Sequence, residues 1–183
     1  RLSEVKAAER FNCSRNTLRE SFTRLAAERI VERIPNRGVF LATPDADYIR
    51  DLFAARAAIE PAAVRWGAFA DAPSLVTLTS SAFDYAARGE HQEVSAINQR
   101  FHRTLVAALG SPTLNEQMDN LLARMRLTFL LAIPRYPQLH ADHIQGNITL
   151  ATHIADGKRL EAATLSHDSL MNTCEKILAV LDD

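Results

Sequence analysis

The sequence predicts a mainly α-helical protein in two units: an N-terminal winged helix-turn-helix over residues 1–44, and an antiparallel all-helical bundle over residues 45–183. Two short amphipathic helices and a strand–turn–strand segment occupy the first 44 residues. No strand pattern follows Asp45, and helical patterns separated by Pro and Gly fill the remainder. The chain has 183 residues, 47% of them hydrophobic, so each unit can have a core of its own.

The first 28 residues show the pattern of a helix-turn-helix. Helices are predicted over 3–11 and 14–28, with Ser3 and Ser14 as their N-caps. In each of them apolar residues recur at the spacing of one helical face, and only two polar turn residues separate the two segments. Two helices joined by so short a turn form the outline of this motif.

The period then changes from that of a helix to that of a strand. Strands are predicted over 30–34 and 39–41, with a Pro-Asn-Arg-Gly turn between them. This hairpin is a candidate wing. Pro44 and Asp45 mark the boundary to the second unit, and Asp45 is a candidate N-cap for the helix that follows.

The remainder of the chain is predicted to be helical throughout. The breaks between helices fall at Pro and Gly residues, as at Gly89 and at Pro134 with Pro137. The predicted helices cover residues 46–69, 73–88, 91–109, 112–133, 138–155 and 157–182.

Charge is distributed unevenly along the chain. Residues 1–44 carry nine basic and five acidic side chains, a net charge of +4, whereas the remainder carries 12 basic and 17 acidic ones, a net charge of −5. A basic head suggests a polyanionic partner, although a solvated charged surface gives the same count.

No apolar run reaches the ~18–20 residues of a membrane span. No leader pattern opens the sequence, and the two cysteines are far apart, so we expect a cytoplasmic protein.

The second helix carries polar and basic residues in its first two turns, where a recognition helix enters the major groove. Arginine pairs with guanine and asparagine with adenine, while hydroxyl groups and backbone amides suit phosphate oxygens. An arginine-rich solvated helix is the alternative interpretation. The candidate DNA-binding residues are Ser14, Arg15, Asn16, Thr17 and Arg19 in the helix, and Arg37 and Gly38 in the hairpin.

These residues also carry a family resemblance. The segment LSEVKAAERFNCSRNTLRESFTRLAAERIVERIPNRGVFL closely resembles the winged-helix domain of the GntR family. GntR domains usually begin with one further helix, so we expect residues upstream of Arg1. The second unit resembles the FadR-type branch with its helical FCD effector domain, in FAARAAIEPAAVRWGA, NQRFHRTLVAALGSPTL and ADGKRLEAA. The resemblance implies a transcriptional regulator that responds to a ligand.

Several polar residues of the second unit fall on apolar helix faces. Asn98 and His102 are one turn apart, and Asn147 and His167 each interrupt an apolar stripe. Because a buried polar side chain needs a partner, such a bundle is expected to contain a cavity. The alternative interpretation is structural: a lone His can be a hydrogen-bonded core residue, and an Arg can be the partner in a structural ion pair. The candidate effector-binding residues are Asn98, His102, Asn147 and His167, with Arg56 and Arg124 near the mouth to neutralise an acidic ligand.

The resemblance also implies a divalent metal, because FCD domains commonly hold one with an Asp and three His residues. In this chain the Asp position is Asn98, one His position falls at about Asn147, and the last falls near Ser169 or Leu170. Neutral amides are poor ligands for a transition metal. Only His102 is therefore a candidate metal ligand, with His143 as a possible substitute, and no cofactor is predicted.

The favoured function is a ligand-responsive transcriptional regulator. We expect a homodimer on a pseudo-palindromic DNA operator, a small organic acid as effector, no membrane partner and no enzymatic activity. A metal-dependent enzyme in the bundle is one alternative, but the sequence has no His-Glu-x-x-His motif and no nucleophile–base pair in a recognisable setting. An interaction module that only dimerises through its helices is the other.

Overall fold

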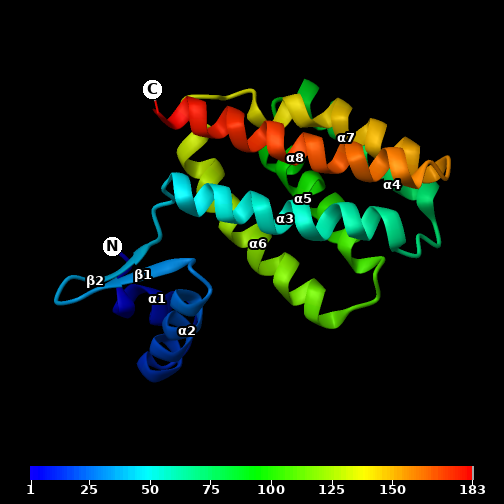
Figure 1. Ribbon diagram of the computed structural model, residues 1–183. Coiled ribbons are helices and arrows are strands. Elements are labelled where there is room, and N and C mark those ends of the chain that lie inside the picture. Colours follow the sequence, from blue (N-terminus) through cyan, green and yellow to red (C-terminus); the bar gives the residue numbers. More distant parts are fainter. Residues whose placement is uncertain (183) are drawn as a thin grey trace.

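The structure, a computed structural model that describes residues 1–182, consists of a small head and an elongated helical bundle (Figure 1). The head contains α1 (Glu4–Arg10), α2 (Arg15–Ala27), β1 (Val31–Ile34) and β2 (Gly38–Leu41). The predicted fold class, a winged helix-turn-helix followed by an all-helical bundle, is confirmed. The helices of the bundle are α3 (Ala46–Trp66), α4 (Ala72–Ala87), α5 (His91–Ala107), α6 (Pro112–Ala132), α7 (Leu139–Ala155) and α8 (Arg159–Asp182).

The head folds around a small core of its own. The hydroxyls of Ser3 and Ser14 accept hydrogen bonds from backbone N–H groups in the first turns of α1 and α2, which fixes where both helices begin. The buried residues come from both helices and both strands and are Ala8, Leu18, Phe22, Val31 and Val39. The two helices therefore pack on the hairpin through one apolar cluster.

The hairpin forms the predicted wing. β1 and β2 pair in antiparallel register, with Ile34 opposite Gly38. Asn36 and Gly38 both have positive φ, at 61° and 107°. Asn and Gly are the residue types that adopt such angles most readily in a tight hairpin turn. The backbone of Leu2 adds a further bridge, to Val39, so the start of the chain is tied to the wing.

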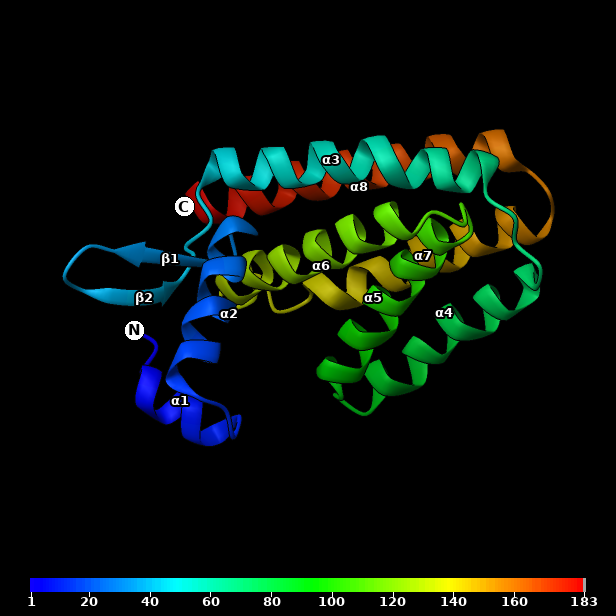
Figure 2. The ribbon, with the colours of Figure 1, turned by 90° about the horizontal axis from the view of Figure 1, so that it is seen from below.

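The bundle is built from antiparallel helix pairs. α3 lies along α8 and α4 along α7, and α5 and α6 pack against them (Figure 2). Side chains of Asp45, Asp71 and Ser111 cap the starts of α3, α4 and α6, as their positions beside Pro or apolar runs suggest. The bundle core includes the fully buried residues Phe53, Phe101, Leu105, Met118 and Ile177.

The predicted helix ends agree with the structure to within three residues. The largest difference is in α3, which ends at Trp66 rather than at residue 69, because the chain leaves the helix at Gly67. Trp66 itself is exposed. Within residues 1–182, no helix is both long and apolar enough to cross a membrane.

Candidate DNA-contacting head and effector cavity

The N-terminal end of α2 presents a polar surface beside the wing. Ser14 accepts a hydrogen bond from the Thr17 backbone N–H at 3.0 Å, and the two hydroxyls lie 2.8 Å apart. Arg15 and Asn16 are exposed, whereas Leu18 is turned into the core of the head. The first turn of α2 therefore offers one guanidinium and one amide to a partner, with the cap hydroxyls beside them.

Arg19 continues this surface but already has a partner. Its Nε lies 3.1 Å from Oε2 of Glu4, and its side chain remains 61% exposed. Arg33 of β1 donates to the Arg19 carbonyl oxygen and to the Thr23 hydroxyl, each at 2.9 Å, and so joins the wing to α2. These hydrogen bonds help to hold the wing in place beside α2.

The wing tip is exposed and basic. Arg37 follows Asn36 in the turn, and its guanidinium lies 5.8 Å from the centre of the Phe40 ring. Gly38 exposes its backbone next to this charge. A guanidinium and a bare backbone at a projecting turn suit a phosphate oxygen or a groove edge.

A cavity of about 40 Å³ lies inside the bundle, where α3, α5, α6, α7 and α8 meet. One water needs roughly 10–15 Å³ by the same measure, so this space is large enough for a few waters or a small organic group. Four of the predicted effector-binding residues, Arg56, Asn98, His102 and Asn147, line it together. Other polar lining residues are Ser95, Gln99, His143, Ser166, Ser169 and Thr173.

A buried carboxylate organises one wall of the cavity. Glu60 is fully buried; its Oε1 accepts from Arg56 Nε at 2.6 Å, and its Oε2 lies 2.6 Å from His102 Nδ1. Burial alone raises the pKa of Glu60, but Arg56 and His102 outweigh that effect and lower the pKa to about 2. Glu60 is therefore ionised at neutral pH and balances the charge of Arg56.

Two polar atoms at this cavity have no partner among the described residues. The Nη2 group of Arg56 and the Nε2 atom of His143 are both buried and make no hydrogen bond. An unpaired buried donor or acceptor costs about 1–3 kcal/mol, so a molecule that satisfies these atoms gains affinity from them. The cavity therefore favours a polar ligand.

Two family models match the chain, and between them they span most of it. The model of the bacterial regulatory proteins of the GntR family matches residues 1–41, and the FCD domain matches residues 51–171. The chain belongs to the GntR family, with an FCD domain. The head is thus the DNA-binding domain of a transcriptional regulator, and the bundle is its C-terminal effector-binding domain.

Individual relatives agree with this assignment. The Nta operon transcriptional regulator of Aminobacter aminovorans is 24% identical over 184 residues, covering 99% of this chain and 86% of that protein. A crystal structure of a GntR transcriptional regulator from Rhodococcus sp. RHA1 has a TM-score of 0.84 at 27% identity, covering 98% and 87% of the two chains. E. coli McbR/YncC shares the fold, with a TM-score of 0.80 at 17% identity and coverage of 99% and 86%.

The residues of this GntR-family protein do not fit the divalent metal that the FCD resemblance implies. Asn98 and Asn147 stand where an Asp and a His were expected, and the Asn147 amide donates a hydrogen bond to the Asn98 carbonyl oxygen. Ser169, at the last expected His position, lines the cavity with its hydroxyl side chain. Among the described residues, no group of three or more His, Cys, Asp or Glu side chains is arranged to hold a metal ion. The paired amides join α5 to α7 directly.

Two of the predicted effector-binding residues lie outside the cavity. The placement of His167 was wrong: its side chain is 53% exposed and pairs with Asp168, while the neighbouring Ser166 is buried and lines the cavity. The placement of Arg124 was also wrong, because it is buried at the junction between bundle and head, where it donates to Asp51 at 2.8 Å. Arg56 is the one predicted arginine at the cavity.

Sequence reasoning missed Glu60, which holds the cavity wall together. A fully buried Glu is rare, so sequence reasoning gives little reason to place one inside the bundle. The available signal was the spacing Arg56–Glu60, four residues apart on one helix, within a run rich in Ala. His140 is also buried, edge-on against the Phe129 ring.

His143 makes the stability of the bundle depend on pH. Burial lowers its pKa from 6.5 to about 4, and the positive charges nearby act in the same direction. Between these pH values the unfolded chain binds a proton that the folded protein excludes, so the free energy of unfolding falls as the pH falls. A shift of this size corresponds to about 3 kcal/mol.

The variant His143→Gln is expected to lose this part of the pH dependence. Urea unfolding at pH 7 and at pH 4 measures it, as the difference between wild type and variant at each pH. The exposed His91→Gln serves as the matched control and is expected to keep the wild-type slope. Equal slopes for wild type and His143→Gln would contradict the burial of a neutral imidazole at this site.

Proposed function

We propose that the cavity binds a small organic acid and that this changes the affinity of the regulator for its operator. The observation that carries the proposal is the buried Nη2 group of Arg56, which lines the cavity and has no partner. A guanidinium N–H matches a carboxylate oxygen in geometry and charge. The amides and hydroxyls around it suit the other polar groups of such a ligand.

The charges of the cavity favour a ligand with a single carboxylate. Arg56 is already balanced by Glu60, and the amides and hydroxyls of the lining are neutral. Nδ1 of His102 faces Glu60, so the other ring nitrogen, Nε2, is left for a polar group of the ligand. A molecule with two or three carboxylates would leave charges without partners in a buried site, which costs free energy.

We also propose the DNA-binding residues, the domain boundary and the assembly of the protein. The DNA-binding residues are Ser14, Arg15, Asn16, Thr17, Arg19, Arg37 and Gly38, with the division between the two domains at residues 44 and 45. Two chains form a homodimer in the cytoplasm and place one head on each half-site of a two-fold symmetric operator. We infer no enzymatic role, since the family is one of regulators and Glu60, the buried carboxylate of the cavity, is occupied by Arg56 and His102.

A thermal-shift screen of small mono-, di- and tricarboxylic acids tests the ligand. A monocarboxylate present at 100 times its dissociation constant is expected to stabilise the protein by ~2.7 kcal/mol. The response is expected to persist in EDTA, because the residues at the cavity do not fit a metal. His102→Ala and Arg56→Met are expected to abolish it, whereas His167→Ala, outside the cavity, keeps it. Loss of the response in EDTA, or an unchanged response in His102→Ala, would contradict the proposal.

A further inference from the structure

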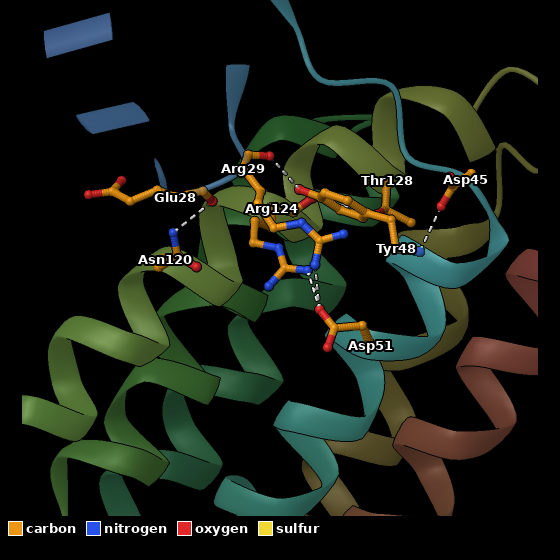
Figure 3. Close-up of polar contacts among 8 residues, drawn as sticks. All are labelled: Glu28, Arg29, Asp45, Tyr48, Asp51, Asn120, Arg124 and Thr128. Atoms are coloured by element: carbon orange, nitrogen blue, oxygen red, sulfur yellow. Dashed lines mark hydrogen bonds and ion pairs between the residues drawn. The ribbon is translucent and has the colours of Figure 1, made fainter. Parts of the chain in front are cut away.

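The end of the recognition helix α2 is held by side chains of the bundle at one small cluster (Figure 3). Oδ2 of Asp51, on α3, accepts a hydrogen bond from Arg29 of the head at 2.9 Å and another from Arg124 of α6 at 2.8 Å. These two contacts lower the pKa of Asp51, the one with Arg124 most strongly. A single carboxylate therefore joins three elements that are distant in the sequence.

Tyr48, one turn before Asp51 on α3, occupies the same cluster. The guanidinium groups of Arg29 and Arg124 lie 4.9 and 4.5 Å from the centre of its ring, and its hydroxyl donates to the Arg29 carbonyl oxygen at 3.0 Å. Asn120 of α6 donates to the Glu28 carbonyl oxygen at 3.1 Å. The bundle thus satisfies two carbonyl groups at the end of α2 that the helix itself leaves unpaired.

The backbone at this point has little freedom of its own. Arg29 has φ +59°, in the left-handed region that side chains other than Asn, Asp and Gly rarely adopt. The contacts of its carbonyl and guanidinium groups with Tyr48 and Asp51 favour this conformation. The cluster therefore fixes the direction in which the chain leaves α2, and with it the angle between α2 and the bundle.

The same two bundle helices also line the cavity. On α3, Arg56 at the cavity follows Asp51 by five residues; on α6, Leu122 and Met125 at the cavity flank Arg124. The rise of a helix is about 1.5 Å per residue, so the cluster lies about 7–8 Å from Arg56 along α3 and less than one turn from the cavity residues of α6. A ligand that displaces α6 relative to α3 must also displace Arg124 relative to Asp51.

We propose that Asp51 is a positioning residue that sets the orientation of the DNA-binding head on the bundle, and thereby the spacing of half-sites that the dimer accepts. It makes no contact with DNA in this role. The proposal about spacing rests on the proposed homodimer, whereas the orientation of the head is a property of one chain. A surface ion pair alone would not have this effect, since such pairs contribute little. Here one carboxylate joins two arginines that share an aromatic ring.

The orientation can be measured within one chain by distances between spin labels. Labels at Glu32→Cys on β1 and Lys158→Cys beside α8 report it, in a Cys13→Ser background with Cys174, which is buried, left in place. Mixing with unlabelled protein removes distances between chains. The wild type is expected to give one narrow distribution, and Asp51→Asn a broad or shifted one. Asp47→Asn, which removes an exposed ion pair with Arg50 on the same helix, is the matched control and is expected to resemble the wild type.

A second variant distinguishes loss of the contact between Asp51 and Arg29 from a general folding defect of Asp51→Asn. Arg29→Asn removes the contact with Asp51 while suiting the positive φ at this position, and it is expected to broaden the distribution as well. Narrow, unshifted distributions in both Asp51→Asn and Arg29→Asn would overturn the proposal.

The role of Asp51 in half-site spacing is tested with DNA duplexes that carry the half-sites selected by the wild type. One base pair is inserted between the two half-sites. The insertion is expected to weaken wild-type binding about tenfold or more and binding by Asp51→Asn about threefold or less, with the half-site sequence unchanged. Equal losses in the two proteins would overturn the role in spacing. If the wild type selected a single unrepeated site, the proposed homodimer would fail instead, and the distance measurement would still decide the role of Asp51 in orientation.

Discussion

Replacing Arg15 and Arg19 together by alanine is expected to weaken operator binding by the full-length protein about a hundredfold or more, because each base-contacting arginine is worth about 1–3 kcal/mol. Both side chains are exposed on the first two turns of α2, the part of a recognition helix that enters the major groove. Arg15 is expected to have the larger effect, since Arg19 must also leave or share its contact with Glu4. Fluorescence anisotropy with a labelled operator duplex measures the affinities.

Arg24→Ala is the matched control for the loss of charge. Arg24 is an exposed arginine on the same helix, but it lies in the last turn of α2, away from the polar N-terminal surface. Its replacement is expected to reduce affinity only slightly and equally for operator and unrelated DNA. An operator affinity of the double variant that matches that of Arg24→Ala would show that α2 is not the recognition helix.

Replacing Glu60 by alanine is expected to destabilise the protein by about 3–5 kcal/mol, the usual cost of removing one partner from a buried ion pair. The reason is that Arg56 is buried and would lose the carboxylate that balances its charge, while His102 would lose the acceptor for its Nδ1. Urea unfolding of the full-length protein measures the change. Asp47→Asn, at an exposed ion pair, is expected to cost less than about 1 kcal/mol.

A double variant separates the ion pair from the packing of Glu60. If the cost comes from an unbalanced Arg56, then Arg56→Met together with Glu60→Ala is expected to be more stable than Glu60→Ala alone, because no buried charge is left. Costs of Arg56→Met and Glu60→Ala that simply add would contradict the coupling. A Glu60→Ala variant as stable as wild type would contradict the buried triad itself.

The local features of this fold were predictable because short-range chemistry determines them. Ser3, Ser14 and Asp45 were identified as N-caps from their positions before apolar runs, and each accepts the expected backbone hydrogen bond. Likewise, the spacing of Asn98 and His102 placed them on one face of one helix, and the structure brings both to the cavity.

The predicted side-chain positions were wrong where burial depends on which helix face packs inward or on a partner distant in the sequence. On α8 the apolar stripe that His167 interrupts is buried at Leu170, Cys174 and Ile177, as predicted. At its start, Leu160 and His167 are exposed, and the buried face runs through Ala162 and Ser166 instead. Apolar residues at steps of three and four leave two phases open, and only packing against α3 selects between them. Arg124 binds Asp51, 73 residues earlier in the chain, a contact that no local pattern indicates.

Binding of a specific operator by the head can be measured by selecting duplexes from a random pool with the full-length protein. The expected result is enrichment of a two-fold symmetric site whose half-sites are bound through Arg15 and Arg19, with an affinity that falls steeply as the salt concentration rises. Enrichment of no sequence, or selection of the same site by the Arg15→Ala/Arg19→Ala variant, would contradict it.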